Sequence, residues 1–132
     1  MRPSVVLCGS YHKAPERLRR LFCELETAGC RILSPISLDF GSNDTFVTTP
    51  TESELSPSDI ERFHLRAIRD ASFIFVHAPD GYIGLSTAYE LGYASALGKP
   101  AFTHTQLVDE MLRTRTHIVQ SVFEALEQFK LA

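Results

Sequence analysis

The chain has 132 residues, of which 44% are hydrophobic, and a formal net charge of -3 at pH 7. This length predicts one domain spanning residues 1–132, and the weak negative charge without basic runs argues against binding to a nucleic acid polymer. No apolar run approaches membrane-spanning length and the N-terminus lacks a secretory pattern, so we expect a cytoplasmic protein with no membrane partner.

Two short apolar runs flank the first predicted helix. Ser4–Cys8 is typical of a buried parallel strand that runs into a turn at Gly9-Ser10. Apolar residues at offsets of three and four predict a helix from about Ala14 to Ala28, and Arg31–Pro35 is predicted as the second strand. The three elements form a β-α-β unit.

A polar stretch without periodicity follows, from about Ile36 to Pro57, and its length indicates a lid or binding loop. Phe40 and Phe46 either stack on a base there or simply pin the loop to the body. The next helix opens at Pro57, where Ser58 and Glu61 have capping-box spacing. Its predicted buried stripe consists of Ile60, Phe63, His64, Ala67, Ile68 and Ala71.

The third strand, Phe73–Val76, is uninterrupted and therefore predicted to be central. The segment Gly84–Gly98 then contains a single charged side chain, Glu90, which predicts a buried helix that ends at Gly98-Lys99-Pro100. A carboxylate in such a helix is costly unless it is used or paired. Glu90 is therefore either a site residue or a structural acid that steadies the helix dipole or pairs with a cation.

The remaining elements complete an alternating pattern. We predict a fourth strand at Pro100–Thr103, a short helix at Leu107–Leu112, an edge strand at Thr116–Val119 and a last helix from Ser121 to about Lys130. Alternation of this kind predicts a three-layer α/β fold, Rossmann-like or flavodoxin-like, with a five-stranded parallel sheet in the order 2-1-3-4-5. The switch point between the first and third strands places a ligand over Cys8-Gly9-Ser10, over His77-Ala78-Pro79-Asp80 and beside the start of the Glu90 helix.

Taken singly, each candidate site residue is only weak evidence for a ligand site. Backbone N–H groups at Gly9, the Ser10 hydroxyl and the Lys13 charge suit a phosphate or a ribose hydroxyl, although an ordinary tight turn is the more common explanation of such a pattern. Ser86 and Thr87 either add hydroxyl donors or cap the helix. Three cysteines without metal-ligand spacing, and histidines without helix-type ligand spacing, predict neither a disulfide nor a metal site.

The segment from Gly84 to Pro100 resembles the signature of a known family. The pattern Gly84-x-Ser86-Thr87-x-x-Glu90-Leu91-Gly92-Tyr93-Ala94-x-Ala96-x-Gly98-Lys99-Pro100 resembles the signature of the nucleoside 2-deoxyribosyltransferase-like superfamily, which includes the 2'-deoxynucleoside 5'-phosphate N-hydrolases. Leu7–Tyr11 is similar to the loop after the first strand of that family, and Ile60–Val76 is similar to its middle region.

The resemblance implies an enzyme that cleaves the N-glycosidic bond of a deoxynucleoside or its 5'-monophosphate, by hydrolysis or by transfer to a base. Glu90 takes the place of the family's nucleophile, which forms a covalent glycosyl-enzyme, and no metal or organic cofactor is implied. Gly9, Ser10, Tyr11, Gly84, Ser86 and Thr87 are the implied substrate-binding residues. A homodimer or larger homo-oligomer is implied too, because the family's sites are often completed by a neighbouring subunit.

The sequence also departs from the family's pattern. The aspartate that protonates the leaving base is replaced by His64, the aspartate six residues before the glutamate is Gly84, and the one before the third strand is Ser72. These changes favour hydrolysis or a divergent activity over base exchange. His64 or Asp80 is the expected acid.

Two alternatives remain open. Pro79-Asp80-Gly81-Tyr82-x-Gly84-x-x-Thr87-x-x-Glu90 is similar to the loop of cytokinin-activating phosphoribohydrolases, from which Asp80 departs. A non-catalytic nucleotide-binding or signalling module would keep the pocket and lose the chemistry.

Overall fold

The structure is a computed structural model that describes residues 2–35 and 56–131. Its strands are β1 (Ser4–Gly9), β2 (Arg31–Ser34), β3 (Phe73–His77), β4 (Ala101–Thr103) and β5 (His117–Ile118). Its helices are α1 (Pro15–Thr27), α2 (Pro57–Asp70), the 3-10 turn η1 (Pro79–Gly81), α3 (Leu85–Ala96), α4 (Glu110–Arg113) and α5 (Val122–Leu131). The predicted loop with Phe40 and Phe46 lies outside the described residues.

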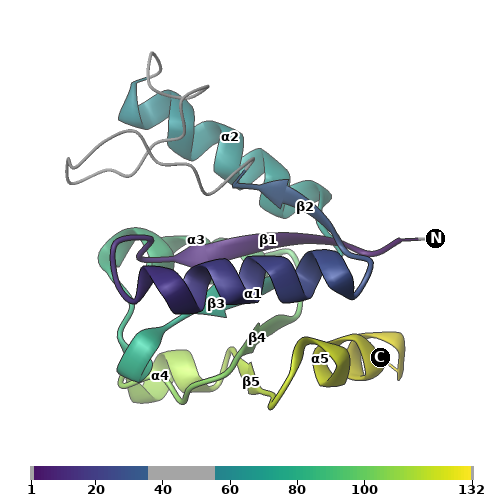
Figure 1. The fold of residues 1–132 in the computed structure, drawn as a ribbon. Helices are drawn as coiled ribbons and strands as arrows, with labels where there is room; N and C mark the ends of the chain where they lie inside the picture. Colours follow the sequence, from purple (N-terminus) through teal and green to yellow (C-terminus); the bar gives the residue numbers. More distant parts are fainter. Residues whose placement is uncertain (1, 36–55, 132) are drawn as a thin grey trace.

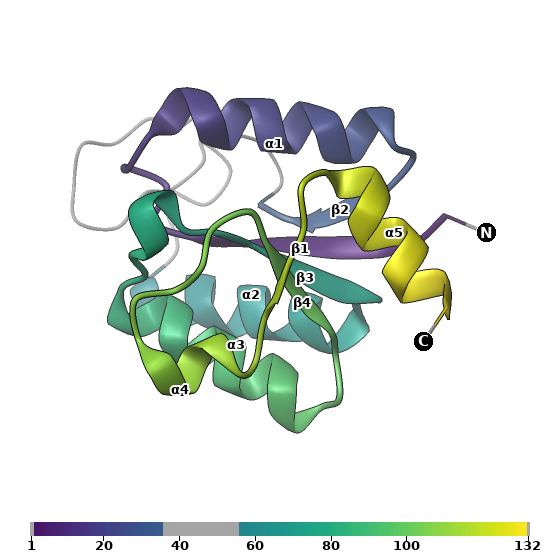
Figure 2. The same ribbon diagram turned by 90° about the horizontal axis from the view of Figure 1, so that it is seen from below.

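All strand pairs are parallel and the sheet order is β2-β1-β3-β4-β5, which confirms the predicted fold class and topology (Figure 1). Helices α1 and α5 cover one face of the sheet, and α2 and α3 cover the other (Figure 2). Strands β1 and β3 are buried on both faces because each face of the sheet has its own layer of helices. None of the helices described is both long and apolar enough to cross a membrane.

Successive residues of β1 enter different cores. Val5 and Leu7 belong to the cluster under α1 and α5, whereas Val6 and Cys8 belong to the cluster under α2 and α3. This alternation follows from the two-residue period of a strand. The same alternation places the side chain of Cys8, the residue before Gly9, on the face covered by α2 and α3.

The start of α2 differs from the prediction. The N-cap is Ser56, whose hydroxyl accepts a hydrogen bond from the Asp59 backbone N–H at 3.1 Å. Ser58 therefore lies inside the helix, and Glu61 is not the partner in a capping box. The predicted stripe is otherwise buried or half-buried, except that Phe63 is exposed. At α5 the predicted cap is confirmed, since Ser121 Oγ accepts from the Glu124 N–H at 3.1 Å.

Helix α3 is less buried than its composition predicted. Thr87, Glu90, Leu91 and Ala94 form its buried face, but Leu85 is 91% exposed. The absence of charge outside Glu90 therefore does not mean that this helix is enclosed on all sides. One apolar flank of α3 meets solvent in the described structure.

Candidate active site

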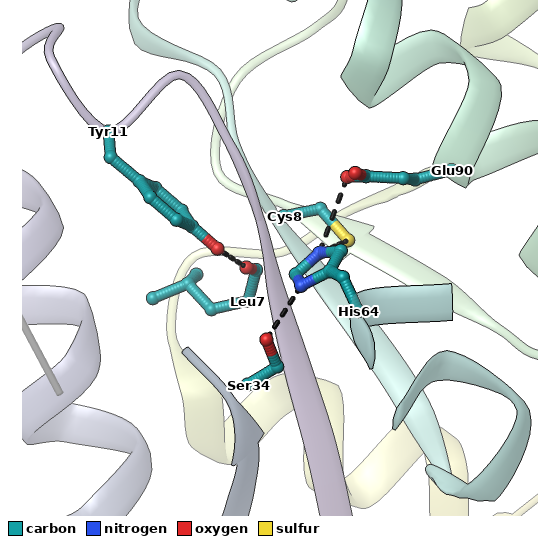
Figure 3. Close-up of polar contacts among 6 residues, drawn as sticks. All are labelled: Leu7, Cys8, Tyr11, Ser34, His64 and Glu90. Atoms are coloured by element: carbon teal, nitrogen blue, oxygen red, sulfur yellow. Dashed lines mark hydrogen bonds and ion pairs between the residues drawn. The ribbon is translucent and has the colours of Figure 1, made fainter. Parts of the chain in front are cut away.

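The Glu90 carboxylate lies in a buried cluster between the sheet and the two helices of its second face (Figure 3). His64 Nε2 from α2 is 3.3 Å from Glu90 Oε1, and the same nitrogen is 3.7 Å from Cys8 Sγ at the end of β1. Glu90 is 6% exposed. The sequence left open whether Glu90 is a site residue or a structural acid, for example one paired with a cation. Among the described residues, no lysine or arginine pairs with it.

The second ring nitrogen of His64 is hydrogen-bonded as well. Its Nδ1 is 2.6 Å from the Ser34 hydroxyl, at the C-terminal end of β2. When Nδ1 carries the ring proton and donates it to Ser34, the lone pair of Nε2 faces Cys8 and Glu90. Ser34 thus orients the histidine, a role that was not predicted from the sequence although the strand that carries it was.

A second carboxylate, Glu61, joins the cluster one helical turn before His64. Burial raises the pKa of Glu61 from 4.5 to about 7, helped by the charge of Glu90 and a hydrogen bond between the two carboxyl groups, while His64 acts in the opposite direction. Its Oε1 is buried and has no hydrogen-bond partner among the described residues. Two carboxyl groups can share a hydrogen bond only if one of them holds a proton, and the raised pKa of Glu61 makes Glu61 the group that holds it.

Sequence reasoning missed Glu61 because its spacing from Ser58 matched a capping box. The signal that identifies it is helical spacing to His64, since residues three apart lie on the same side of a helix. The Cys8 thiol is also part of the group. Burial raises its pKa well above the usual value, with Glu90 as the next cause, and this keeps the thiol protonated.

The other predicted residues lie around this cluster at different distances from it. Gly9 has a φ of 143°, and a Cβ there would come within 2.3 Å of the His77 carbonyl oxygen, so only glycine fits. His77 Nε2 donates to the Lys13 carbonyl at 2.6 Å and fixes the loop after β1, while burial lowers the pKa of His77. The backbone of the loop that begins at Ser10 is therefore fixed at Gly9 and at Lys13.

Tyr11 packs on the face of the sheet opposite to the one that holds Cys8. Its hydroxyl donates to the Leu7 carbonyl at 2.6 Å, and its ring packs against the core under α1 and α5 (Figure 3). Gly84 is the N-cap of α3 and makes no side-chain cap. Of the two hydroxyl residues that follow it, Ser86 is exposed and Thr87 is buried.

Asp80 lies apart from the cluster, on η1, where its φ is 58° and its side chain is exposed. It borders a pocket of about 400 Å³ together with Lys13, Arg17 and Tyr82. The Lys13 ammonium is 4.3 Å from the centre of the Tyr82 ring, a cation–π arrangement. The Tyr82 hydroxyl is near Gly84, so this pocket adjoins the N-terminus of α3.

The same fold occurs in three solved structures, an N-glycosidase and two 2-deoxyribosyltransferases, which agrees with the resemblance seen in the sequence. Three solved structures show it at 17–19% identity, a level at which the likeness is one of fold. A scan of protein-family models and a search of curated proteins found no match.

The first of these structures is the CMP N-glycosidase BcmB of Clostridium botulinum, with a TM-score of 0.59, 18% identity and coverage of 97% of this chain and 98% of that one. The second is a 2-deoxyribosyltransferase of Bacillus psychrosaccharolyticus, with a TM-score of 0.59, 19% identity and coverage of 94% and 90%. The third is a 2-desoxiribosyltransferase of Leishmania mexicana, with a TM-score of 0.57, 17% identity and coverage of 96% of both chains.

Proposed function

We propose that this chain is an enzyme that cleaves the N-glycosidic bond of a deoxynucleoside or deoxynucleoside 5'-monophosphate, with Glu90 as the nucleophile. The observation that carries the proposal is the burial of the Glu90 carboxylate beside His64 and Glu61, at the carboxyl end of β1 where α/β folds bind ligands. The fold shared with an N-glycosidase and two deoxyribosyltransferases points to the same reaction class.

The reaction would proceed in two displacements. A Glu90 carboxylate oxygen forms a bond to C1' of the sugar while the C1'–N bond breaks, and its electron pair goes to the base nitrogen. The base takes up a proton from an acid of the cluster. Water then attacks C1', the acid recovers a proton from that water, and the Glu90 carboxylate leaves; an acceptor base in place of water gives transfer.

We assign the acid to Glu61, with His64 as its neighbour in the same cluster. A pKa of about 7 lets the Glu61 carboxyl hold a proton near neutral pH and still release it to a developing base anion. Asp80 is exposed and lies outside the contacts that join Glu90 to its neighbours. The sequence-based assignment of an acid to Asp80 therefore has less support than the assignment to the α2 residues.

A 5'-monophosphate is the substrate form that the charges favour. Lys13 and Arg17 both line the pocket beside the α3 N-terminus, where unpaired N–H groups attract an anion. We expect Lys13→Ala and Arg17→Ala to raise KM for the monophosphate and leave KM for the nucleoside nearly unchanged. Equal effects on both substrates would assign the two cations a role other than phosphate binding.

The deciding experiment is a chromatographic screen for base release from deoxynucleosides, ribonucleosides and their 5'-monophosphates, with and without an acceptor base. Release that disappears in Glu90→Gln, while the circular dichroism spectrum stays native, establishes the enzyme. Tight nucleotide binding without turnover in the wild type would instead establish a binding module. Glu127→Gln, which removes an exposed carboxylate on α5, is the matched control and should retain full release.

We also propose that the chain forms a homodimer or larger homo-oligomer through α3. Leu85 and Tyr89 are exposed on that helix, 91% and 58%, and Leu97 follows at its C-cap. Light scattering of the wild type and of Leu85→Glu tests this. An assembly that the substitution reduces to monomers agrees with the proposal, and a monomeric wild type contradicts it.

A further inference from the structure

The cluster around Glu90 contains three different ligand types for a metal ion. Cys8 of β1, His64 of α2 and Glu90 of α3 each present one donor atom, and these three atoms lie within 4.8 Å of one another (Figure 3). All three side chains are buried. The group is formed from three elements, which explains why ligand spacing along the sequence predicted no metal site.

The distances suit a tetrahedral ion. Ligand atoms at 2.0–2.3 Å from a zinc ion lie roughly 3.3–3.8 Å from each other. The separations here are 3.7 Å between Cys8 Sγ and His64 Nε2, and 3.3 Å between His64 Nε2 and Glu90 Oε1. The second is longer than a charge-assisted hydrogen bond of about 2.7–2.9 Å, so the pair is not drawn together as an ordinary ion pair would be.

The surroundings of His64 match those of a metal ligand. Histidines that bind metals usually donate their other ring N–H to a neighbouring acceptor, which fixes the ring and directs the free lone pair at the ion. The 2.6 Å contact between His64 Nδ1 and the Ser34 hydroxyl is of this kind. Ser34 itself is buried, so the contact is shielded from water.

The charge of the cluster also favours a divalent cation. Glu61 and Glu90 are two neighbouring carboxyl groups, and within the described parts of the chain His64 is the one basic side chain with a nitrogen within 4.0 Å of either carboxylate. Buried acids in this number require protons or a cation. A thiolate with an imidazole and a carboxylate is a donor set for zinc rather than for magnesium or calcium, which prefer oxygen ligands alone.

We propose that Cys8, His64 and Glu90 form a zinc-binding site, in which Glu61 or a water molecule supplies the fourth ligand. On binding, the Cys8 S–H bond breaks, its sulfur electron pair binds the ion and one proton leaves to the solvent; no oxidation is involved. A consequence, which rests on the proposed function, is that zinc engages the carboxylate needed for attack on C1'. Zinc therefore inhibits base release, and its removal restores it.

The test is a titration of the full chain with Co²⁺, which replaces zinc and gives visible bands, after treatment with a chelator and its removal. We expect one cobalt ion per chain, tetrahedral bands in the visible range and a thiolate-to-cobalt absorption in the near ultraviolet. Added Zn²⁺ should abolish these signals. Cys8→Ser should lose the thiolate absorption, and Cys23→Ser should retain it because Cys23 is an exposed residue of α1 on the other face of the sheet.

Glu90→Gln provides a second variant in case Cys8→Ser fails to fold, and it should weaken cobalt binding at least 10-fold. The proposal is overturned if the wild type binds less than one ion per chain, or if the thiolate absorption survives in folded Cys8→Ser or disappears in Cys23→Ser. These readouts do not depend on catalysis. A chain that binds cobalt but releases no base contradicts the proposed function alone, and base release without cobalt binding contradicts the zinc site alone.

Discussion

The two faces of the sheet are built from the same strands but hold different kinds of side chain. The face under α1 and α5 is packed with apolar groups, among them Phe73, whose ring meets Phe102 edge-on at 5.4 Å. The face under α2 and α3 has its own apolar cluster but also encloses Cys8, His64 and Glu90. The first face therefore stabilises the fold through apolar packing alone, whereas the second also buries polar groups, which is costly in free energy.

The largest expected effect comes from the polar face. Glu90→Gln should lower base release about 10⁴-fold or more, because the attacking carboxylate becomes a poor nucleophile. Its free energy of unfolding should not fall, since the substitution removes a buried charge. Rates from chromatography and urea unfolding curves provide the two measurements. A variant that releases base at the wild-type rate would place the chemistry elsewhere.

The reciprocal change on the apolar face is Phe73→Ala. We expect a loss of about 3–5 kcal/mol in the free energy of unfolding, because a large cavity remains in the core. Base release per folded molecule should be unchanged. Phe123→Ala on α5 is the control, since Phe123 is 58% exposed and its loss should be nearly neutral. An equal destabilisation by the two substitutions would contradict the described packing.

Glu61→Gln sharpens the assignment within the polar face. Loss of a general acid should lower base release about 10²-fold, less than loss of the nucleophile. A substrate whose leaving group needs no proton should be cleaved at nearly the wild-type rate by this variant. Asp70→Asn, at the exposed end of the same helix, is the control and should not affect either substrate. Equal losses with both substrates would mean that Glu61 acts by positioning and not by proton transfer.

The same carboxyl group should affect stability as a function of pH. Its pKa is 4.5 when the chain is unfolded and about 7 when folded, so between these values the folded chain holds a proton that the unfolded chain has released. The free energy of unfolding contributed by Glu61 is therefore lost as pH rises from 4.5 to 7.

Urea unfolding of the wild type and Glu61→Gln at pH 5 and pH 8, both with a chelator present, measures this contribution. The variant should gain stability relative to the wild type at pH 8. The comparison must be made at each pH because Cys8, His64 and Glu90 face Glu61, and because the pKa of His77, lowered by burial, contributes a slope of opposite sign. A wild-type and variant difference that does not change with pH would contradict the raised pKa of Glu61.

The smallest effect concerns the start of α2, the helix that carries both Glu61 and His64. Ser56→Ala should cost about 1 kcal/mol in the free energy of unfolding, because the N–H of Asp59 loses its hydrogen-bond acceptor. Ser58→Ala should change it by no more than a few tenths of a kcal/mol. Calorimetry or urea unfolding distinguishes the two, and a larger effect at Ser58 would restore the capping box that the sequence predicted.

These comparisons show what the sequence could predict. Periodicity and turn residues predicted the elements and the parallel order because both follow from local patterns. Glu90 was found because a lone charge in an apolar helix is unusual. Cys8 was predicted to lie beside the ligand but was given no chemical role, because its contact with His64 depends on which elements meet at the end of β1. Glu61 was missed because it fitted a local capping pattern that Ser56 in fact fulfils.

The residues of the cluster are far apart in the chain, with Cys8 and His64 separated by 56 positions. No single helix or hairpin can therefore bring them together, and a compact state that keeps its secondary structure but loses side-chain packing would retain its far-ultraviolet signal without the cluster. Catalysis or cobalt colour would thus report the last stage of folding, the docking of α2 and α3 onto the sheet, rather than the formation of the helices themselves.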